Sequence, residues 1–196
     1  MLEKEIRAAY DEQTITVYQA YRKEIAEAAV RSQKIVSPFK IERMTWIKPS
    51  FLWMMYRSGW GSKEGQEHVL AIKIKRSGFE WALQNSCLSH FNSSIYENYE
   101  SWKSILSSSP VRIQWDPEKD MYLENLNYRS IQIGLSGIAV SKYVNEWTES
   151  ITDITEDCKN IRSLIQKGEI DEAKKLLPIE EIYPLPHLIK KLIGHS

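Results

Sequence analysis

The sequence predicts an α+β fold, with a mixed or mainly antiparallel sheet and packed helices in a single domain over residues 1–196. Segments rich in β-branched and aromatic residues, typical of strands, alternate irregularly with stretches whose apolar residues recur at helical spacing. There is no strict strand–helix–strand rhythm and no glycine-rich phosphate loop, so a parallel nucleotide-binding sheet is not indicated. The 196 residues, 42% hydrophobic and 27% charged, suffice for one sizeable core.

The first part of the chain predicts a strand between two helical segments. Residues 2–10 suit one or two helical turns. Residues 14–21 (TITVYQAY) are β-branched and aromatic, which predicts a strand with Ile15 and Val17 on one face. Residues 22–34 carry apolar side chains at helical spacing opposite charged ones, which predicts an amphipathic helix.

The middle of the chain predicts a buried helix, a strand and an insertion. Residues 50–57 are apolar almost all round, which is typical of a buried helix. Residues 68–75 (HVLAIKIK) predict a strand, and a helix should run through 79–83. Residues 92–109 are rich in Ser, Asn, Tyr and Glu, and predict a surface insertion with a short helix at 102–106.

The last part of the chain again mixes both element types. Strands are expected at 111–115, 128–135 and 151–154. Asp116-Pro117-Glu118 is a natural turn after the first of these. Helices are expected at 140–147, 155–167 and 169–177, with a last basic turn at 187–193.

Composition excludes several classes of function. Lys plus Arg equals Asp plus Glu at 26 each, so no global basic field captures nucleic acid, although a local basic groove remains open. Cys87, Cys158 and the four histidines match no metal or redox spacing, which predicts no metal site and a reducing, cytoplasmic location. We expect no signal peptide and no membrane span.

The most informative stretch is residues 43–60, where aromatic and cationic side chains are interleaved. Three tryptophans and three cations stand in it: Arg43, Trp46, Lys48, Trp53, Arg57 and Trp60. Cations within an aromatic wall lose hydration and need an anionic partner. Either a ligand occupies a concave pocket here, or the stretch is a core helix whose cations pair with the protein's own carboxylates.

Three strand segments carry polar residues that suit a cleft. Gln19 shares a face with Ile15 and Val17, so its amide should be partly buried and bonded either to a loop or to a ligand. On 111–118, Arg112, Gln114 and Asp116 alternate with apolar residues, which fits either a solvated face or a cleft edge that also includes Glu118. On the third, Ser130, Gln132 and Gly134 share a face, and Gly134 permits close approach of a backbone or ligand.

Five segments together resemble the family called domain of unknown function 4291. They are residues 6–11, 16–21, 43–60, 111–118 and 128–137. The likeness covers nearly the whole chain, and the block at 43–60 is long enough to be specific. The resemblance implies no established activity.

A weaker likeness is to the ADP-ribosyltransferase superfamily. Tyr18-Gln19, on a strand followed by a helix, stands where those enzymes carry the polar pair that binds the nicotinamide side of NAD. The resemblance implies that NAD is the cofactor and that a later strand supplies a catalytic carboxylate. It assigns Gln19 and Tyr21 to the nicotinamide ribose, Trp46 or Trp53 to stacking, and Arg43, Lys48 and Arg57 to phosphate. The catalytic candidates are Glu118, Asp116 and Gln132.

The leading hypothesis is therefore an NAD-dependent ADP-ribosyltransferase-like enzyme that acts on a nucleotide or nucleic acid. The alternative is a non-catalytic module that binds a nucleotide or single-stranded RNA by Trp stacking and Arg/Lys contacts. A third reading is a protein-interaction domain in which the aromatic stretch is simply core.

Overall fold

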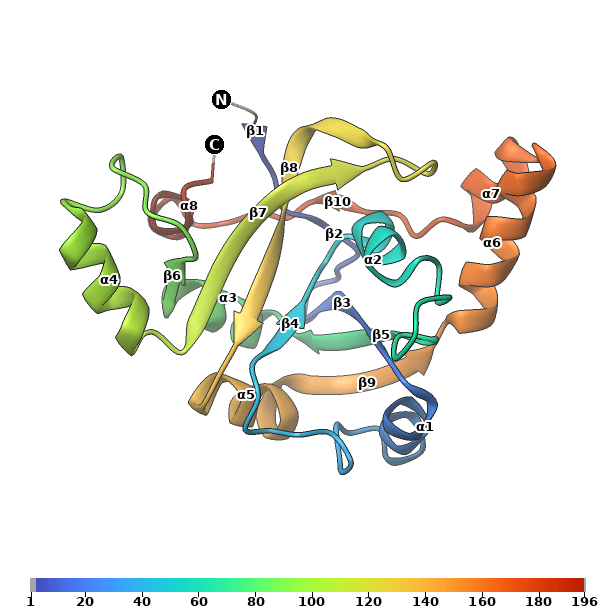
Figure 1. Ribbon diagram of the computed structural model, residues 1–196, viewed down its shortest axis with the longest axis horizontal. Helices are drawn as coiled ribbons and strands as arrows, with labels where there is room; N and C mark the ends of the chain where they lie inside the picture. The colour runs from blue at the N-terminus through green and yellow to red at the C-terminus, as the bar shows by residue number, and fades with distance from the viewer. Residues whose placement is uncertain (1–2, 196) are drawn as a thin grey trace.

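The computed structural model describes residues 3–195 and contains two β-sheets whose strands cross at a steep angle (Figure 1). The larger sheet has the order β1 (Glu3–Lys4), β8 (Asn125–Leu135), β7 (Val111–Lys119) and β6 (Ser86–Leu88), with β4 (Thr45–Ile47) also paired to β8. The smaller sheet has the order β3 (Thr14–Tyr21), β5 (His68–Lys75) and β9 (Thr148–Asp153). A third pair joins β10 (Glu181–Ile182) to β2 (Arg7–Ala8).

Pairing within the sheets is mainly antiparallel. The long hairpin of β7 and β8 is antiparallel, as are all neighbours in the smaller sheet. Parallel pairing is made by the short strands β1 and β6, with the long strands β8 and β7 respectively. The two sheets meet where the Tyr18 N–H donates to the Lys48 carbonyl at 2.7 Å. The predicted mixture of helices with a mainly antiparallel sheet is confirmed.

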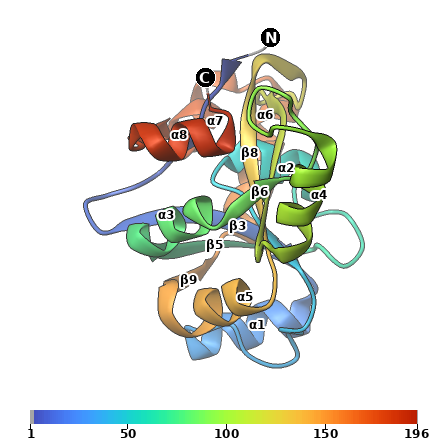
Figure 2. The same cartoon turned by 90° about the vertical axis from the view of Figure 1, so that its left-hand side faces the viewer.

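Helices cover the sheets and close their ends (Figures 1 and 2). They are α1 (Lys23–Ser32), α2 (Phe51–Ser58), α3 (Arg76–Gln84), α4 (Tyr99–Ser108), α5 (Ile138–Lys142), α6 (Thr155–Lys167), α7 (Ile170–Leu176) and α8 (His187–Ile193). The chain after α5 continues as a π-helical turn, η1 (Tyr143–Trp147). Helix α2 begins at Phe51 because the Ser50 hydroxyl accepts the Trp53 N–H at 3.1 Å, and it ends at Gly59, which has a positive φ of 60°.

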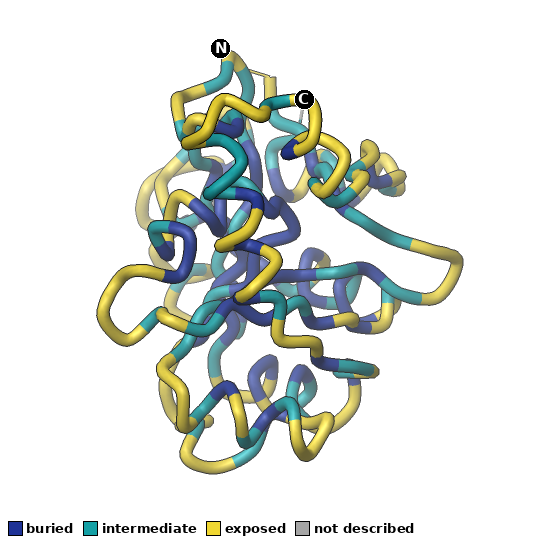
Figure 3. Tube along the Cα trace, turned by 90° about the vertical axis from the view of Figure 1, so that its right-hand side faces the viewer, coloured by how far each residue is buried: buried dark blue, intermediate teal, exposed yellow. Residues whose placement is uncertain are grey.

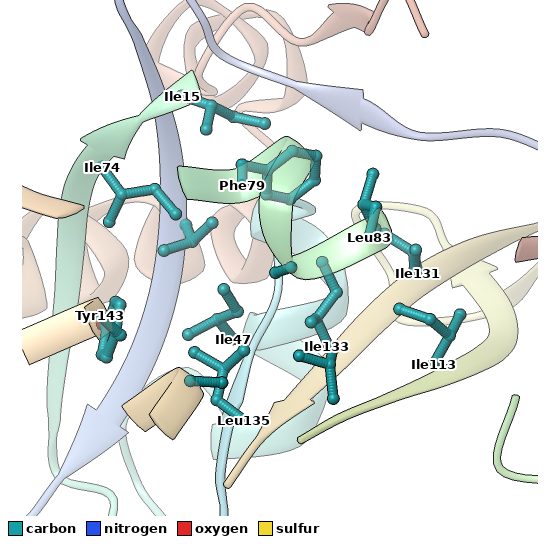
Figure 4. Packing of buried hydrophobic residues seen from close by; sticks show 14 of the residues in the cluster. Ile15, Ile47, Ile74, Phe79, Leu83, Ile113, Ile131, Ile133, Leu135 and Tyr143 are labelled. Atoms are coloured by element: carbon teal, nitrogen blue, oxygen red, sulfur yellow. The ribbon is translucent and has the colours of Figure 1, made fainter. Parts of the chain in front are cut away.

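The main core lies between the two sheets, and α3 contributes Phe79 and Leu83 to its middle (Figure 4). Ile15 and Ile74 reach it from the smaller sheet, Ile133 from β8, Phe79 from α3 and Tyr143 from η1, and all five are fully buried. The alternation along 14–21 places Ile15 and Val17 here, as the sequence predicted.

A second core lies on the other face of the smaller sheet. Tyr18 contributes from β3, Phe51 and Met55 from α2, and Cys158 and Ile161 from α6. The predicted burial of the 50–57 helix is therefore confirmed. Figure 3 shows the buried segments gathered in the middle of the molecule and the exposed ones in its peripheral loops.

The prediction of helix at residues 2–10 is wrong. Two short strands occupy this segment: β1 pairs with β8, and β2 pairs with β10 near the end of the chain. Ile6, between the two strands, and Ala8, in β2, are fully buried. Local composition favours a helix there, but pairing with distant strands and burial outweigh that preference.

The predicted turn at Asp116-Pro117-Glu118 is also wrong, because β7 continues through all three residues to Lys119. The register against β8 shifts between Pro117 and Lys119. Such an irregularity accommodates a proline, which has no N–H to donate to the ladder. As a result, Asp116 and Glu118 lie on the sheet rather than in a turn.

The insertion at 92–109 is better anchored than a surface loop. Its helix, α4, is longer than predicted, and Trp102 on it is buried. The Trp102 indole N–H donates to the Leu88 carbonyl at 2.8 Å, which fastens α4 to the end of β6. Within residues 3–195, no helix has both the length and the apolar character to span a membrane.

Candidate functional site

The strands of the two sheets and the end of α2 enclose a cavity of about 690 Å³, called here the central cavity. Seven of the sequence-predicted site residues line it: Gln19, Tyr21, Arg43, Trp46, Lys48, Arg57 and Gln132. They come from β3, β4 and its flanks, the C-terminal turn of α2, and β8. Gln66 and Gln114 complete the polar lining together with Glu64. The pocket that the 43–60 stretch suggested is therefore present and concave.

Lys48 is the most buried cation of the cavity, only 4% exposed. Its Nζ donates to the Gln132 Oε1 at 2.7 Å and lies 4.2 Å from the centre of the Trp53 ring. Burial lowers the pKa of Lys48 to about 7; the nearby Asp116 carboxylate opposes this shift and Arg57 adds to it. Lys48 is thus held by a neutral amide and an aromatic face.

Asp116 lies behind this amide and orients it. One of its oxygens accepts the Gln132 Nε2–H at 2.6 Å, and the other accepts the Gln114 Nε2–H at 2.9 Å. Because Gln132 donates to Asp116, its carbonyl oxygen must face Lys48. The carboxylate therefore acts on the cavity through two amides that line it.

Arg43 and Arg57 are exposed residues at the rim of the cavity. Among the ion pairs of residues 3–195, none includes Arg43, Lys48 or Arg57. The aromatic part of the stretch is core, as one alternative expected, and Lys48 is buried near the Asp116 carboxylate, whereas the two arginines are exposed. Three cations instead face one polar cavity, which favours an anionic ligand.

Gln19 lines the cavity, but its polar atoms are engaged by the protein. Its Nε2 donates to the Thr45 Oγ1 at 2.7 Å and to the Trp46 carbonyl at 3.0 Å. Its Oε1 accepts from the Tyr143 hydroxyl at 2.7 Å. Tyr21 also contacts the Thr45 hydroxyl, at 3.3 Å. Gln19 therefore fixes β3 against β4 and η1, and shapes the cavity wall.

The two tryptophans proposed for stacking differ in position. Trp46 is half-buried and lines the cavity, with its ring over Gly134 of β8. A Cβ at Gly134 would lie 2.9 Å from the Trp46 ring, so only glycine permits this close approach. Trp53 is buried beneath Lys48 and is not part of the cavity lining.

Glu118 lies apart from the central cavity. It is buried, accepts from the Ser50 hydroxyl at 2.9 Å and lines a separate cavity of about 300 Å³. Glu180 lines the same small cavity and accepts the Phe51 N–H at 2.7 Å, at the start of α2. Burial raises the pKa of both carboxyls, and that of Glu180 reaches about 8. Hydrogen bonds oppose this shift in both groups, and the Glu118 carboxylate adds to it in Glu180.

Some site residues gave no sequence signal. Gln66 stands in a glycine-containing loop with nothing to mark it, and Glu180 belongs to a C-terminal segment far from α2 in the sequence. The alternation along 111–118 did place Gln114 and Asp116 on one face. In the structure Gln114 lines the cavity directly, and Asp116 is linked to it through Gln114 and Gln132. Among residues 3–195, no cluster of three or more His, Cys, Asp or Glu residues is arranged to hold a metal ion.

Together, the crossed sheets and the cation-lined cavity define a mixed α and β domain with a candidate anion-binding cleft. A family model, described as a domain of unknown function (DUF4291), matches residues 5–183. The chain therefore belongs to the DUF4291 family. A comparison with curated proteins gives no match. The family description names no activity, so function rests on the site itself.

Proposed function

We propose that the central cavity binds the phosphate of a nucleotide, and that the reaction is ADP-ribosyl transfer from NAD. One observation carries the proposal: Arg43, Lys48 and Arg57 converge on one cavity in a chain with no net charge. Such a local concentration of positive charge attracts an anion, and arginine side chains suit phosphate geometry in particular.

The remaining lining residues support a nucleotide rather than a simple anion. Gln66 and Gln114 offer amides for hydrogen bonds to a sugar or base, and Trp46 offers a ring face for stacking. The volume of about 690 Å³ lies in the range of small-molecule and cofactor sites.

For the transfer step, we assign the stabilising carboxylate to Asp116. The bond between the ribose C1′ and the nicotinamide nitrogen breaks, and its electron pair leaves with nicotinamide. An oxygen or nitrogen of the acceptor bonds to C1′ and releases its proton to water. The negative charge of Asp116 would stabilise the positive charge that develops at C1′ from behind the two glutamine amides, since the carboxylate itself does not line the cavity. Asp116 is coupled to the cavity through Gln132 and Gln114, whereas Glu118 lines the smaller cavity.

Binding is tested by calorimetry with ADP-ribose and NAD on the wild type and Arg57→Gln. Loss of a charge-assisted contact should weaken binding by about 1.5–3 kcal/mol, at least about tenfold in Kd. Arg31→Gln is the matched control, because Arg31 is an exposed arginine on α1 that does not line the cavity. Equal affinity in Arg57→Gln and the control would contradict phosphate binding at this site.

Catalysis is tested separately by measuring nicotinamide released from NAD in the presence of mixed RNA, DNA and protein acceptors. Asp116→Asn should abolish release, since the amide carries no charge. Because an amide has only one acceptor oxygen for the two glutamine N–H groups that Asp116 accepts, NAD affinity of the variant is measured in the same experiment, which separates loss of the reaction from loss of binding. No release with any acceptor would remove the transferase reaction while leaving nucleotide binding in place.

A non-catalytic binding module is the second candidate, and one observation favours it. Both oxygens of Asp116 already accept hydrogen bonds from glutamines, as a purely structural carboxylate would. This candidate predicts RNA affinity that falls steeply with salt and no nicotinamide release. In either case we propose a reducing cytoplasmic location, where the two buried free thiols of Cys87 and Cys158 persist.

A further inference from the structure

A second cavity of about 380 Å³ adjoins the central cavity and is called here the side cavity. It lies between the start of α1 and the segment 38–45. The two cavities share four lining residues: Tyr21, Arg43, Met44 and Thr45. The two cavities therefore adjoin at these residues, and the exposed Arg43 belongs to the lining of both.

The side cavity combines an apolar wall with positive charge. Phe39 packs edge-on against Tyr21, with ring centres 6.0 Å apart, and Ile25 and Pro38 extend the apolar surface. Arg22 and Lys40 line it as well as Arg43, and no carboxylate does.

The charge of these cations is available to a ligand. The ion pair of Arg22 is with Glu24 at 3.6 Å, between two exposed side chains, where solvent weakens the attraction. Across both cavities the cations are five, Arg22, Lys40, Arg43, Lys48 and Arg57, and the only acidic lining residue is Glu64. A ligand that fills both cavities would thus meet strong positive charge over its whole length.

We propose that the ligand carries two nucleosides joined through phosphate, with the linkage at Arg43 and the second nucleoside in the side cavity against Phe39. This inference rests on the proposed binding of a nucleotide in the central cavity. Two cavities joined at a cation match two ring systems joined by an anion, and an aromatic wall accepts a base of any sequence. The linkage is either the pyrophosphate of a dinucleotide or the phosphodiester of a single-stranded nucleic acid.

The test compares the affinities of AMP, NAD and a single-stranded oligoadenylate for the wild type, Phe39→Leu and Lys40→Gln. Phe39→Leu keeps an apolar side chain but removes the ring, and Lys40→Gln changes an exposed residue that does not endanger folding. Lys34→Gln is the matched control, because Lys34 is exposed and lines neither cavity.

In the wild type, a ligand with two nucleosides should bind at least about tenfold more tightly than AMP. Phe39→Leu and Lys40→Gln should reduce this preference severalfold and leave the Kd of AMP unchanged. If the variants reduce the preference for NAD over AMP, the linkage is the pyrophosphate of a dinucleotide. If they reduce only the preference for the oligonucleotide over AMP, the linkage is the phosphodiester of a nucleic acid.

Two results would overturn the inference. AMP binding as tightly as both longer ligands, or variants that affect all three ligands equally, would show that the side cavity takes no nucleoside. If Arg57→Gln weakens AMP in that case, nucleotide binding in the central cavity still holds. If none of the three ligands binds, both proposals fail together.

Discussion

Lys48 is the residue whose chemistry depends most on its surroundings. A buried ammonium is ordinarily paired with a carboxylate, but here its contacts are the Gln132 carbonyl and the face of Trp53. Burial brings its pKa to about 7, so amine and ammonium are balanced near neutral pH. The positive charge of the cavity therefore depends on pH, although the rim arginines stay charged.

This balance predicts that nucleotide binding takes up a proton. A phosphate beside Lys48 favours the ammonium, so the pKa of Lys48 rises on binding and affinity falls as the pH increases from 7 to 9. Calorimetry at pH 7.5 in two buffers of different ionisation enthalpy measures the uptake. Lys48→Arg, which is always charged, should show no uptake at that site and a flatter pH profile. Equal uptake in both proteins would contradict the role of Lys48.

At the scale of elements, two carboxyl groups gather at the N-terminus of α2. Glu118 accepts from its capping Ser50, and Glu180 accepts the N–H of its first residue, Phe51. A helix N-terminus favours negative charge, but burial of both carboxyls and their proximity to each other oppose it. The balance raises the pKa of Glu180 to about 8.

We predict that Glu180→Gln stabilises the protein at alkaline pH. Because the folded pKa of about 8 exceeds the unfolded value of about 4.3, the folded state holds an extra proton between these values. Stability is therefore lost as pH rises from about 5 to 8. The glutamine still accepts the Phe51 N–H and carries no charge, so thermal unfolding followed over this range should show a flatter profile and a higher Tm at pH 8. A lower Tm at pH 8 would show that the charged carboxylate stabilises α2.

Sequence pattern predicted the long elements well and the short ones poorly. The strands at 14–21 and 68–75 match in full because β-branched and other apolar or aromatic residues are frequent along their whole length. The three-residue strands β4 and β6 were missed, since they exist only through pairing with distant partners. The N-terminal strands were predicted as helix for the same reason.

The site was predictable to the extent that its residues are close in sequence. Arg43, Lys48 and Arg57 converge because β4 leads directly into α2, and local composition indicated this. The partners of each group were not predictable, because they come from other strands. Tyr143, which bonds to Gln19, is 124 residues away in the sequence.

At the scale of the whole molecule, single-domain organisation predicts a particular pattern of proteolysis. Residues 89–98 form no regular element. Phe91 within them is 38% exposed, and Tyr99, the first residue of α4, is 52% exposed. Chymotrypsin should therefore cut first at these residues or near the chain ends. The fragments should stay associated, because β6 pairs with β7 and Trp102 is anchored to Leu88. Two stable fragments that separate near residue 60 would instead indicate two domains.

The hydrogen bonds of Gln19 have a consequence for the kinetics of binding. They tie β3, β4 and η1 into one unit at the floor of the central cavity, whereas Arg43 and Arg57 stand exposed at its rim. If the cavity binds an anion as proposed, the anion meets the exposed rim first, so salt should slow its association by screening those charges. Its release would then require the contact with the buried Lys48 to break. Ionic strength and mutation of the rim should therefore govern the rate of arrival, and the floor should govern the residence time.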